Sequence, residues 1–235
     1  MDISIVIPAY NEDQRIGITL EKSASFLARR PWTWELIVVD DGSADATVDR
    51  VRDYARQCDV IRCVENGRNC GKGYSIRHGV RQAQGRYIGF MDADYKTDIA
   101  ALDIAVQHLE KGDDGVIGDR TLAASHIAVQ RRGYRQWGSD VFRRLLNAAI
   151  GLGDFKDTQC GFKFFRAEVM RDLFSRQRID GYMFDVEILL LASRSGYRIR
   201  SIPVEWRDDP DSRFKPVSGM ARNLGELARI RWMHR

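Results

Sequence analysis

The chain has 235 residues, of which 44% are hydrophobic and 30% are charged, and its formal net charge is +4. The length and the absence of a Pro/Gly/Ser-rich linker predict one domain with a substantial core and exclude a disordered chain. Because the basic excess is small and forms no dense stripe or recognisable motif, we expect no nucleic acid partner.

The start of the sequence and its cysteines bear on cellular location. Residues 1–12 lack the basic segment of a signal peptide, and no run of about 18 apolar residues occurs, so we expect neither a signal peptide nor a membrane span. The cysteines form no C-x-x-C pair or zinc spacing, which favours reduced, structural thiols; they are Cys58, Cys63, Cys70 and Cys160. We therefore expect a cytoplasmic protein.

Short apolar runs alternate with longer helical patterns through the first half of the chain. This spacing predicts strands at 3–8, 35–40, 60–64 and 86–92, and helices ending near residue 27, at 47–57 and at 74–84. Repeated βαβ units of this kind indicate an α/β fold with a mostly parallel central sheet flanked by helices. Ligands of such sheets bind beyond the carboxyl ends of the strands.

The second half is less regular. A basic, aromatic stretch at 130–152 is followed by the segment DTQCGFKFF at 157–165, and a helix is expected around 184–196. A strand at 197–206, a loop at 207–216 and a closing helix at 217–235 complete the chain. We interpret this half as an addition built on the same sheet.

Carboxylates gather where the predicted strands end. Glu12 follows the first strand, Asp40 and Asp41 end the second, and Asp92 and Asp94 follow the fourth. Two carboxylates this close repel each other unless a cation lies between them, and Asp-x-Asp suits a hard divalent ion such as Mg²⁺ or Mn²⁺. A solvated loop and, for DDGS at 40–43, a simple turn with a helix cap remain the structural alternatives.

Lys72 lies in a glycine-rich segment, NCGKGYS at 69–75, ahead of a predicted helix. Backbone N–H groups and a lysine in this position suit a phosphate. The segment is too short for a P-loop, and no G-x-G-x-x-G follows the first strand. The sequence therefore argues against a P-loop nucleotidase and against a dinucleotide-binding enzyme.

These segments carry a family resemblance. VIPAYNE, VVDDGS, NCGKG and MDADY, which begin at residues 6, 38, 69 and 91, resemble family 2 glycosyltransferases of the GT-A fold. GDR, RQWGS and DTQCGFKFF, which begin at 118, 135 and 157, resemble the polyprenyl-phosphate branch, and most of all the dolichyl-phosphate β-glucosyltransferases.

The resemblance extends from residue 3 to about residue 216. It implies a single GT-A domain over 1–235, with a nucleotide-sugar half at 1–118, an acceptor half at 119–216 and an amphipathic helix at 217–235. The implied activity is inverting transfer of a hexose, with UDP-glucose as the expected donor, to a polyprenyl or dolichyl phosphate at the cytoplasmic membrane face.

For the donor, the resemblance implies a set of contacts and a metal. Asp94 would be the main ligand of Mg²⁺ or Mn²⁺, and Asp92 would contact metal or ribose. Related mannosyl enzymes often carry a glutamine two positions after the second aspartate, where this chain has Lys96, so the third ligand stays open. The remaining donor-binding residues would be Pro8, Tyr10, Glu12, Asp40, Asp41 and Lys72, with Arg213 and Lys215 in a lid.

The acceptor poses an electrostatic problem. A phosphate monoester has a second pKa of about 6, so it is already largely dianionic at neutral pH and needs cations rather than a general base. The resemblance assigns the lipid phosphate to Arg120, Arg135 and Ser139, and gives Asp157 the place of a catalytic carboxylate that orients the acceptor or the sugar. A soluble hydroxyl acceptor and a non-catalytic binding domain are the alternatives.

Two amphipathic stretches offer a peripheral membrane contact. The closing helix spaces Met220, Leu224, Leu227 and Ile230 on one face beside several arginines, and a second stretch repeats this pattern with Trp137, Val141, Leu145 and Ile150. Such stripes fit an interfacial helix, but they fit packing against the protein's own core equally well. The sequence says nothing about oligomeric state.

Overall fold

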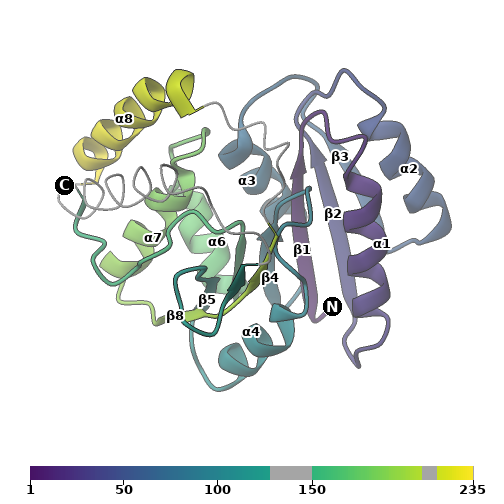
Figure 1. The fold of residues 1–235 in the computed structure, drawn as a ribbon, viewed down its shortest axis with the longest axis horizontal. Coiled ribbons are helices and arrows are strands. Elements are labelled where there is room, and N and C mark those ends of the chain that lie inside the picture. Colours follow the sequence, from purple (N-terminus) through teal and green to yellow (C-terminus); the bar gives the residue numbers. More distant parts are fainter. Residues whose placement is uncertain (128–149, 208–215, 235) are drawn as a thin grey trace.

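The computed structural model describes residues 1–127, 150–207 and 216–234, and its strands form a seven-stranded sheet with helices on both faces (Figure 1). Across the sheet the order is β3 (Ile61–Glu65), β2 (Trp34–Asp40), β1 (Ile3–Ala9), β4 (Tyr87–Met91), β7 (Phe162–Arg166), β5 (Gly115–Gly118) and β8 (Ile199–Ile202). β7 is antiparallel to β4 and β5, and the other neighbouring pairs are parallel. A separate parallel pair joins β6 (His126–Ile127) to β9 (Glu205–Trp206).

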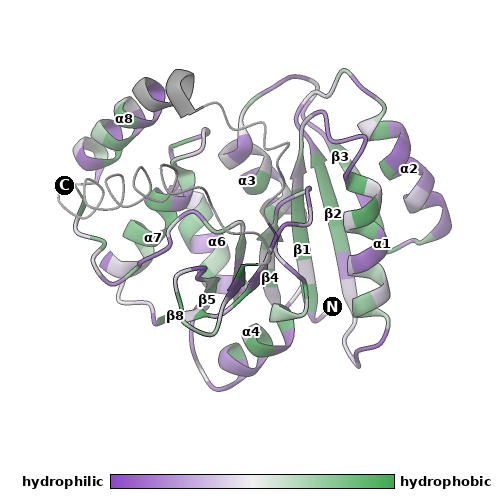
Figure 2. Cartoon of the chain, viewed as in Figure 1, coloured by the Kyte–Doolittle hydropathy of each residue, from purple (hydrophilic) through white to green (hydrophobic). Residues whose placement is uncertain are grey.

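Alternation along the strands divides the core into two layers, because successive side chains point to opposite faces of a sheet. Ile5 of β1 packs in one layer and Val6 in the other. The first layer is covered by α1 (Ile16–Leu27), α2 (Thr47–Gln57) and α4 (Ala101–Glu110); the second by α3 (Lys72–Gln82), α6 (Ala167–Arg176), α7 (Phe184–Arg194) and α8 (Pro216–Met233). The strands are mainly green in Figure 2, and purple gathers on outward helix faces such as that of α2.

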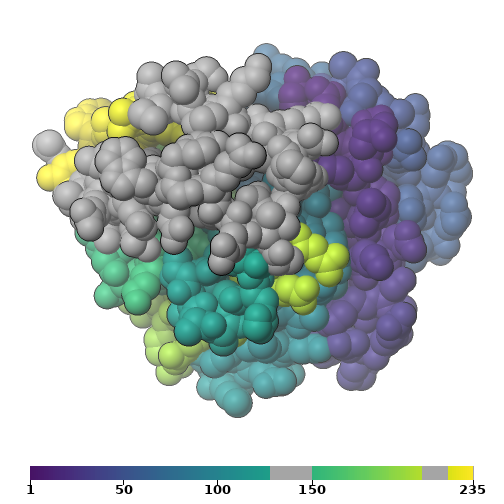
Figure 3. All heavy atoms as spheres, in the orientation of Figure 1, coloured from purple at the N-terminus to yellow at the C-terminus, as the bar shows by residue number. Residues whose placement is uncertain are grey.

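The two halves of the chain meet inside the sheet. β4 belongs to the first half and β7 to the second, and the two strands are hydrogen-bonded neighbours. On the face in Figure 3, purple and blue residues of the first half occupy one side, and green and yellow residues of the second half lie on the other. Of the first-half strands that end in predicted site residues, β4 lies directly at this junction, and β1 and then β2 follow it in the sheet.

The predicted α/β architecture is confirmed, with the expected strands and helices of the first half in place. The sequence did not predict β7, which enters the sheet in the antiparallel direction. Its residues Phe162, Phe164 and Phe165 are fully buried, and a strand buried on both faces lacks the alternating pattern by which strands are recognised.

The closing helix α8 uses much of its apolar stripe inside the protein. Leu227 and Ile230 are buried in the core beside α7, whereas Leu224 is 46% exposed. The membrane interpretation of this stripe is therefore wrong for Leu227 and Ile230, and core packing is what they do. Trp137, Val141 and Leu145 of the other stretch lie outside the described residues. None of the helices in the described part of the chain has the length and apolar character that crossing a membrane requires.

Polar contacts also fasten α8 to α7. The Glu226 carboxylate accepts the backbone N–H of Met183, just before α7, at 3.1 Å. Near the other end of α8, His234 Nε2 lies 2.7 Å from the Glu187 carboxylate, which is buried and also accepts the N–H of Ile179 at 2.8 Å. These contacts hold α8 against the half of the sheet to which β7 belongs.

Candidate active site

The loops that follow β1 and β2 are tied together at the carboxyl edge of the sheet. Asn11, which has a left-handed φ of 55°, donates its N–H to Ser43 Oγ at 2.9 Å, and its side-chain oxygen accepts the N–H of Ala44 at 2.8 Å. Tyr10 is 46% exposed at this edge. The Glu12 carboxylate accepts two hydrogen bonds from the side chain of Arg15, three residues along the chain. This edge therefore presents an aromatic ring, while Glu12 binds the residue that precedes α1.

Asp41 fixes the glycine-rich loop before α3. Its Oδ1 accepts the N–H of Cys70 at 2.8 Å, and its Oδ2 accepts the N–H of Gly71 at 2.9 Å. Gly71 has a φ of 104°, and a Cβ atom there would lie 2.4 Å from the carbonyl oxygen of Asp180, so only glycine fits. Asp41 is thus a loop-building residue, and its role in binding the donor stays a prediction.

Asp40 is buried, and only one of its two carboxylate oxygens accepts hydrogen bonds from the described residues. Its Oδ2 accepts the N–H groups of Gly42 and Ser43 at 3.0 and 3.1 Å. Its Oδ1 is buried and has no hydrogen-bond partner among the described residues. Because buried carboxylate oxygens are normally hydrogen-bonded, this atom is suited to accept an N–H from a ligand.

Lys72, at the start of α3, forms an ion pair with Asp92 at the end of β4, with Nζ 2.7 Å from Oδ1. Burial acts to raise the pKa of Asp92, but the charges of Lys72, Lys163 and Arg120 outweigh it and lower this pKa below its usual range. A Cβ atom on Gly161 would lie 2.0 Å from Asp92 Oδ2, so the glycine leaves the space that the carboxylate occupies. Asp92 is therefore an ionised carboxylate held by a neighbouring lysine.

Asp94 is paired in the same way with Lys96. The Lys96 Nζ lies 3.1 Å from Asp94 Oδ2, and the Lys96 N–H donates to Asp94 Oδ1 at 3.3 Å. Both side chains are largely shielded, with 16% and 17% of their surface exposed. Each aspartate of the acidic pair thus has its own lysine.

The carboxylate oxygens of the acidic pair, Asp92 and Asp94, fit a divalent ion that takes its other ligands from a bound substrate and water. In the described ranges no group of three or more His, Cys, Asp or Glu side chains is placed to bind a metal. Mg²⁺ commonly takes one or two protein carboxylates and completes its shell with water and phosphate oxygens. Asp92 and Asp94 supply those carboxylates, so the remaining ligands would have to come from a bound diphosphate and water.

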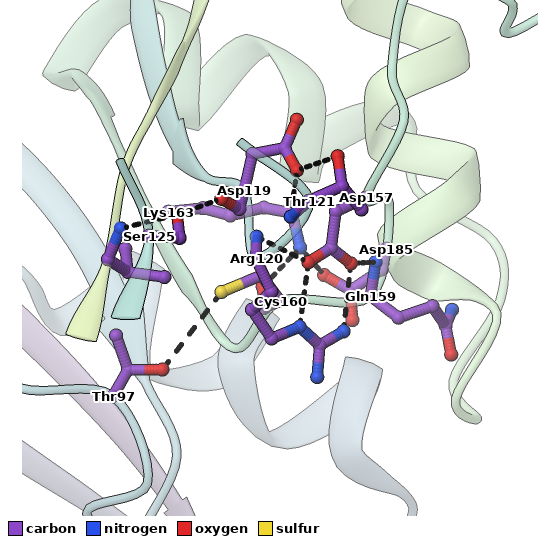
Figure 4. Close-up of polar contacts among 11 residues, drawn as sticks. Thr97, Asp119, Arg120, Thr121, Ser125, Asp157, Gln159, Cys160, Lys163 and Asp185 are labelled. Carbon is purple, nitrogen blue, oxygen red and sulfur yellow. Dashed lines mark hydrogen bonds and ion pairs between the residues drawn. The ribbon is translucent and has the colours of Figure 1, made fainter. Parts of the chain in front are cut away.

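Arg120 and Asp157 form a second ion pair, in which Asp157 is buried and the Arg120 side chain is 18% exposed (Figure 4). The Arg120 Nε and Nη2 atoms donate to the two Asp157 oxygens at 2.7 and 2.8 Å, and the Arg120 backbone N–H adds a third bond at 3.0 Å. Burial acts to raise the pKa of Asp157, but its bonds to Arg120 prevail and lower it. The guanidinium carbon also lies 5.4 Å from the ring centre of Trp206. The structure therefore brings these two predicted residues together, with the carboxylate directing the arginine.

A lysine that sequence reasoning missed lies near enough to this pair for its charge to lower the pKa of Asp157. The Lys163 Nζ, fully buried in β7, donates to the carbonyl oxygen of Cys160 at 2.7 Å and pairs with the carboxylate of Asp185 (Figure 4). Burial raises the pKa of Asp185, although Lys163 and Lys72 act in the opposite direction. A lysine between phenylalanines in FKFF and an aspartate before the apolar run VEILLLA were the available sequence signals.

The described charges thus form a cluster of three cations and three carboxylates: Lys72, Arg120, Lys163, Asp92, Asp157 and Asp185. Its members interact across pairs, since Asp92 and Asp185 both raise the pKa of Lys72 against the opposing effect of burial. The predicted residues Arg135, Ser139 and Arg213, with Lys215, lie outside the described residues. The cluster is balanced in charge, and its partly exposed cations, Lys72 and Arg120, are the ones available to a phosphate group.

Known proteins resemble this chain along nearly all of its length. A dolichyl-phosphate beta-glucosyltransferase of Trichomonas vaginalis is 34% identical over 243 aligned residues, covering 99% of this chain and 74% of the relative. The Saccharomyces cerevisiae protein of the same name is 31% identical, over 97% of this chain and 74% of its own length. The human protein of that name is 31% identical, over 91% of this chain and 70% of its own length.

Solved structures share the fold. Glucosyl-3-phosphoglycerate synthase of Mycobacterium tuberculosis superposes with a TM-score of 0.74 at 23% identity, covering 98% of this chain and 79% of its own. Mannosyl-3-phosphoglycerate synthase of Rubrobacter xylanophilus gives a TM-score of 0.74 at 16% identity, over 100% of this chain and 74% of its own. At this level of identity, the likeness establishes the architecture and leaves the substrates to other arguments.

Residues 4–174 match glycosyl transferase family 2, and this range holds the acidic pair, Lys72, Arg120, Asp157 and Lys163. The family match and the relatives agree with the predicted class of enzyme. The chain is a glycosyltransferase and belongs to glycosyl transferase family 2.

Proposed function

We propose that this enzyme transfers glucose from UDP-glucose to a polyprenyl phosphate such as dolichyl phosphate, with inversion at the anomeric carbon. The observation that carries the proposal is the relationship, over 91–99% of the chain, to proteins named dolichyl-phosphate beta-glucosyltransferase. The partly exposed guanidinium of Arg120 supports an acceptor whose reacting group is a phosphate. The proposed site of action is the cytoplasmic face of a membrane, in keeping with four unpaired cysteines.

On the donor side, the loops after β1 and β2 would hold the nucleotide. The buried, unpartnered Oδ1 of Asp40 is suited to the N–H of a uracil ring, and the exposed ring of Tyr10 to stacking on it; Pro8 and Glu12 would complete the wall, and Asp41 would support it. A structural neighbour of the same fold was crystallised with Mn²⁺ and UDP-glucose, which supports this class of donor.

At the diphosphate, Lys72 and the acidic pair have separate tasks. Lys72 begins α3, so its ammonium and the helix N-terminus both offer positive charge to a phosphate. Asp92 and Asp94 would hold Mg²⁺ or Mn²⁺, with Asp94 as the principal protein ligand. The ion supplies Lewis-acid stabilisation of the UDP leaving group. Arg213 and Lys215 are assigned to closing over the diphosphate on the strength of the sequence resemblance alone.

On the acceptor side, the phosphate dianion is itself the nucleophile. One of its oxygens bonds to the anomeric carbon from the face opposite UDP, and the bond between that carbon and the diphosphate oxygen breaks with its electron pair leaving on UDP. Arg120 binds the phosphate with the N–H groups that Asp157 does not occupy, while Asp157 holds its guanidinium in place. Arg135 and Ser139 are proposed as further phosphate contacts. No proton has to be removed from the acceptor.

The activity is tested by incubating the purified chain with UDP-glucose, other UDP-hexoses or GDP-mannose, and with a short polyprenyl phosphate or 3-phosphoglycerate. We expect UDP-glucose and the polyprenyl phosphate to give a product heavier than the acceptor by one hexosyl unit, with a β linkage by NMR. Product from 3-phosphoglycerate alone would favour a soluble acceptor. Binding of UDP without product from any pair would instead favour a non-catalytic domain.

A lipid acceptor requires contact with a membrane surface, and we propose that the exposed side of α8 makes it. Trp232 is 72% exposed and lies on this side with the exposed Arg229. Tryptophan is favoured at membrane interfaces, and arginine is attracted to anionic headgroups. The contact would be peripheral and weakened by salt.

Trp232→Ala is therefore expected to reduce sedimentation of the protein with anionic phospholipid vesicles several-fold, since a tryptophan ring contributes about 2 kcal/mol when removed from water. Ile18→Ala, which changes an apolar residue on α1 that is 53% exposed, is the matched control and should bind like wild type. Equal sedimentation of the two variants and wild type would remove Trp232 from the membrane contact.

A further inference from the structure

Lys96 lies beside the acidic pair and, unlike a typical surface lysine, keeps only 16% of its side-chain surface exposed. Its ammonium contacts the carboxylate that the proposed function gives to the metal, 3.1 Å from Asp94 Oδ2. Lys72 makes the equivalent contact to Asp92 at 2.7 Å. Both carboxylates expected to face a divalent cation are therefore already neutralised by side chains of the chain itself.

The backbone around Lys96 fixes this contact. Tyr95 adopts a left-handed φ of 52°, which turns the chain so that Lys96 folds back onto Asp94. The carbonyl oxygen of Lys96 accepts the N–H of Arg207 at 2.8 Å, and Thr97 forms a β-bridge with Trp206. A non-glycine residue rarely adopts a left-handed φ without support from its surroundings, and here β9 and the residue after it provide that support. Lys96 is held beside the acidic pair from two sides.

A fixed ammonium at this position affects a metal and a diphosphate in opposite ways. A divalent ion that binds Asp94 must replace the ammonium or lie a few ångströms from it, and either arrangement weakens metal binding through lost pairing or direct repulsion. A diphosphate that approaches the same carboxylates is attracted to the ammonium. Removing the charge should therefore strengthen metal binding and weaken metal-free nucleotide binding.

We propose that Lys96 is a built-in cation of the donor site that shares Asp94 with the divalent ion, lowers the affinity of the site for that ion, and contributes to holding the donor diphosphate. This inference rests on the proposed donor site. In this proposal, Lys96 sets the concentration of free Mg²⁺ or Mn²⁺ that the enzyme requires. The ammonium of Lys96 thereby supplies part of the positive charge that a metal ion would otherwise provide.

The test measures binding in the full chain. Free Mn²⁺ is followed by electron paramagnetic resonance during titration of the protein, with and without UDP, and UDP affinity is measured separately in a chelator. The variant Lys96→Met removes the charge, keeps the side-chain length and adds no oxygen or nitrogen ligand. Lys96→Arg keeps the charge, and Lys111→Met repeats the change at an exposed lysine after α4.

For Lys96→Met we expect Mn²⁺ affinity to rise about tenfold or more and metal-free UDP affinity to fall several-fold. Lys96→Arg and Lys111→Met should stay near wild type in both measurements. Mn²⁺ affinity that is unchanged or lower in Lys96→Met overturns the proposal, as does a parallel loss of both affinities, which is the mark of a merely structural residue. If no protein binds Mn²⁺ even with UDP present, the proposed metal site itself is wrong and this inference falls with it.

Discussion

Asp94→Asn is expected to lower the rate of glucosyl transfer by at least two orders of magnitude while the free energy of unfolding changes by no more than about 1 kcal/mol. The change removes one negative charge from the proposed principal metal ligand, which lies where β4 has already ended. Its partner Lys96 remains partly accessible to water, so it can be solvated once its partner is neutral. Steady-state transfer assays and urea unfolding measure the two quantities.

The same substitution at an exposed aspartate, Asp59→Asn, provides the control and should leave both quantities unaffected. Near-normal transfer by Asp94→Asn would contradict the role given to this carboxylate. So would full activity of the wild-type enzyme in an excess of chelator. A large loss of stability in Asp94→Asn would instead make Asp94 a structural residue.

Lys163→Met is expected to lower the free energy of unfolding by about 3–5 kcal/mol, because it leaves the buried Asp185 without the cation that compensates it. A buried charge that loses its partner retains the cost of leaving water without the attraction that offsets it. Urea unfolding followed by tryptophan fluorescence measures the change.

A double variant separates the charge from the shape of the site. Lys163→Met combined with Asp185→Leu removes both charges and should restore most of the lost stability, since replacing a buried ion pair by apolar groups is often close to neutral. Arg56→Met breaks an exposed pair with Asp53 and should cost less than about 1 kcal/mol. If Lys163→Met costs no more than Arg56→Met, the buried pair has no special role in stability.

The sequence predicted those parts of the fold that depend on local pattern. The spacing of apolar residues in the first half indicates the parallel sheet. Because Asp92 and Asp94 directly follow a predicted strand, the sequence also predicts that they lie at the carboxyl edge of that sheet. Lys163 was missed because a single lysine in an apolar strand carries no information about the helix that will cover it. Its partner, Asp185, lies 22 residues away along the chain.

Other residues were located correctly, but their contacts depend on long-range packing. Asp41 was predicted at the edge of the sheet, yet its hydrogen bonds to Cys70 and Gly71 span about 30 residues and cannot be read from a turn-like DDGS. The stripe on α8 was recognised, but whether Leu227 faces lipid or core depends on how α8 docks on α7. Periodicity defines a face of a helix and leaves its partner open.

The way the charges of the cluster are paired along the chain bears on how enzymes of this kind can diversify. Lys72 and Asp92 both lie within residues 1–118, whereas Arg120 with Asp157 and Lys163 with Asp185 lie wholly within residues 119–216. Each of these three pairs is therefore complete within one portion, whereas Arg77 of the first portion pairs with Asp180 of the second at 2.7 Å. Recombination that joins residues 1–118 to the corresponding later portion of a relative would separate none of these three pairs. A substitution that removes one charge of a pair, by contrast, leaves the other charge without its partner. Exchange of residues 119–216 as a whole segment therefore keeps each of these three ion pairs intact, whereas altering the charges one at a time does not.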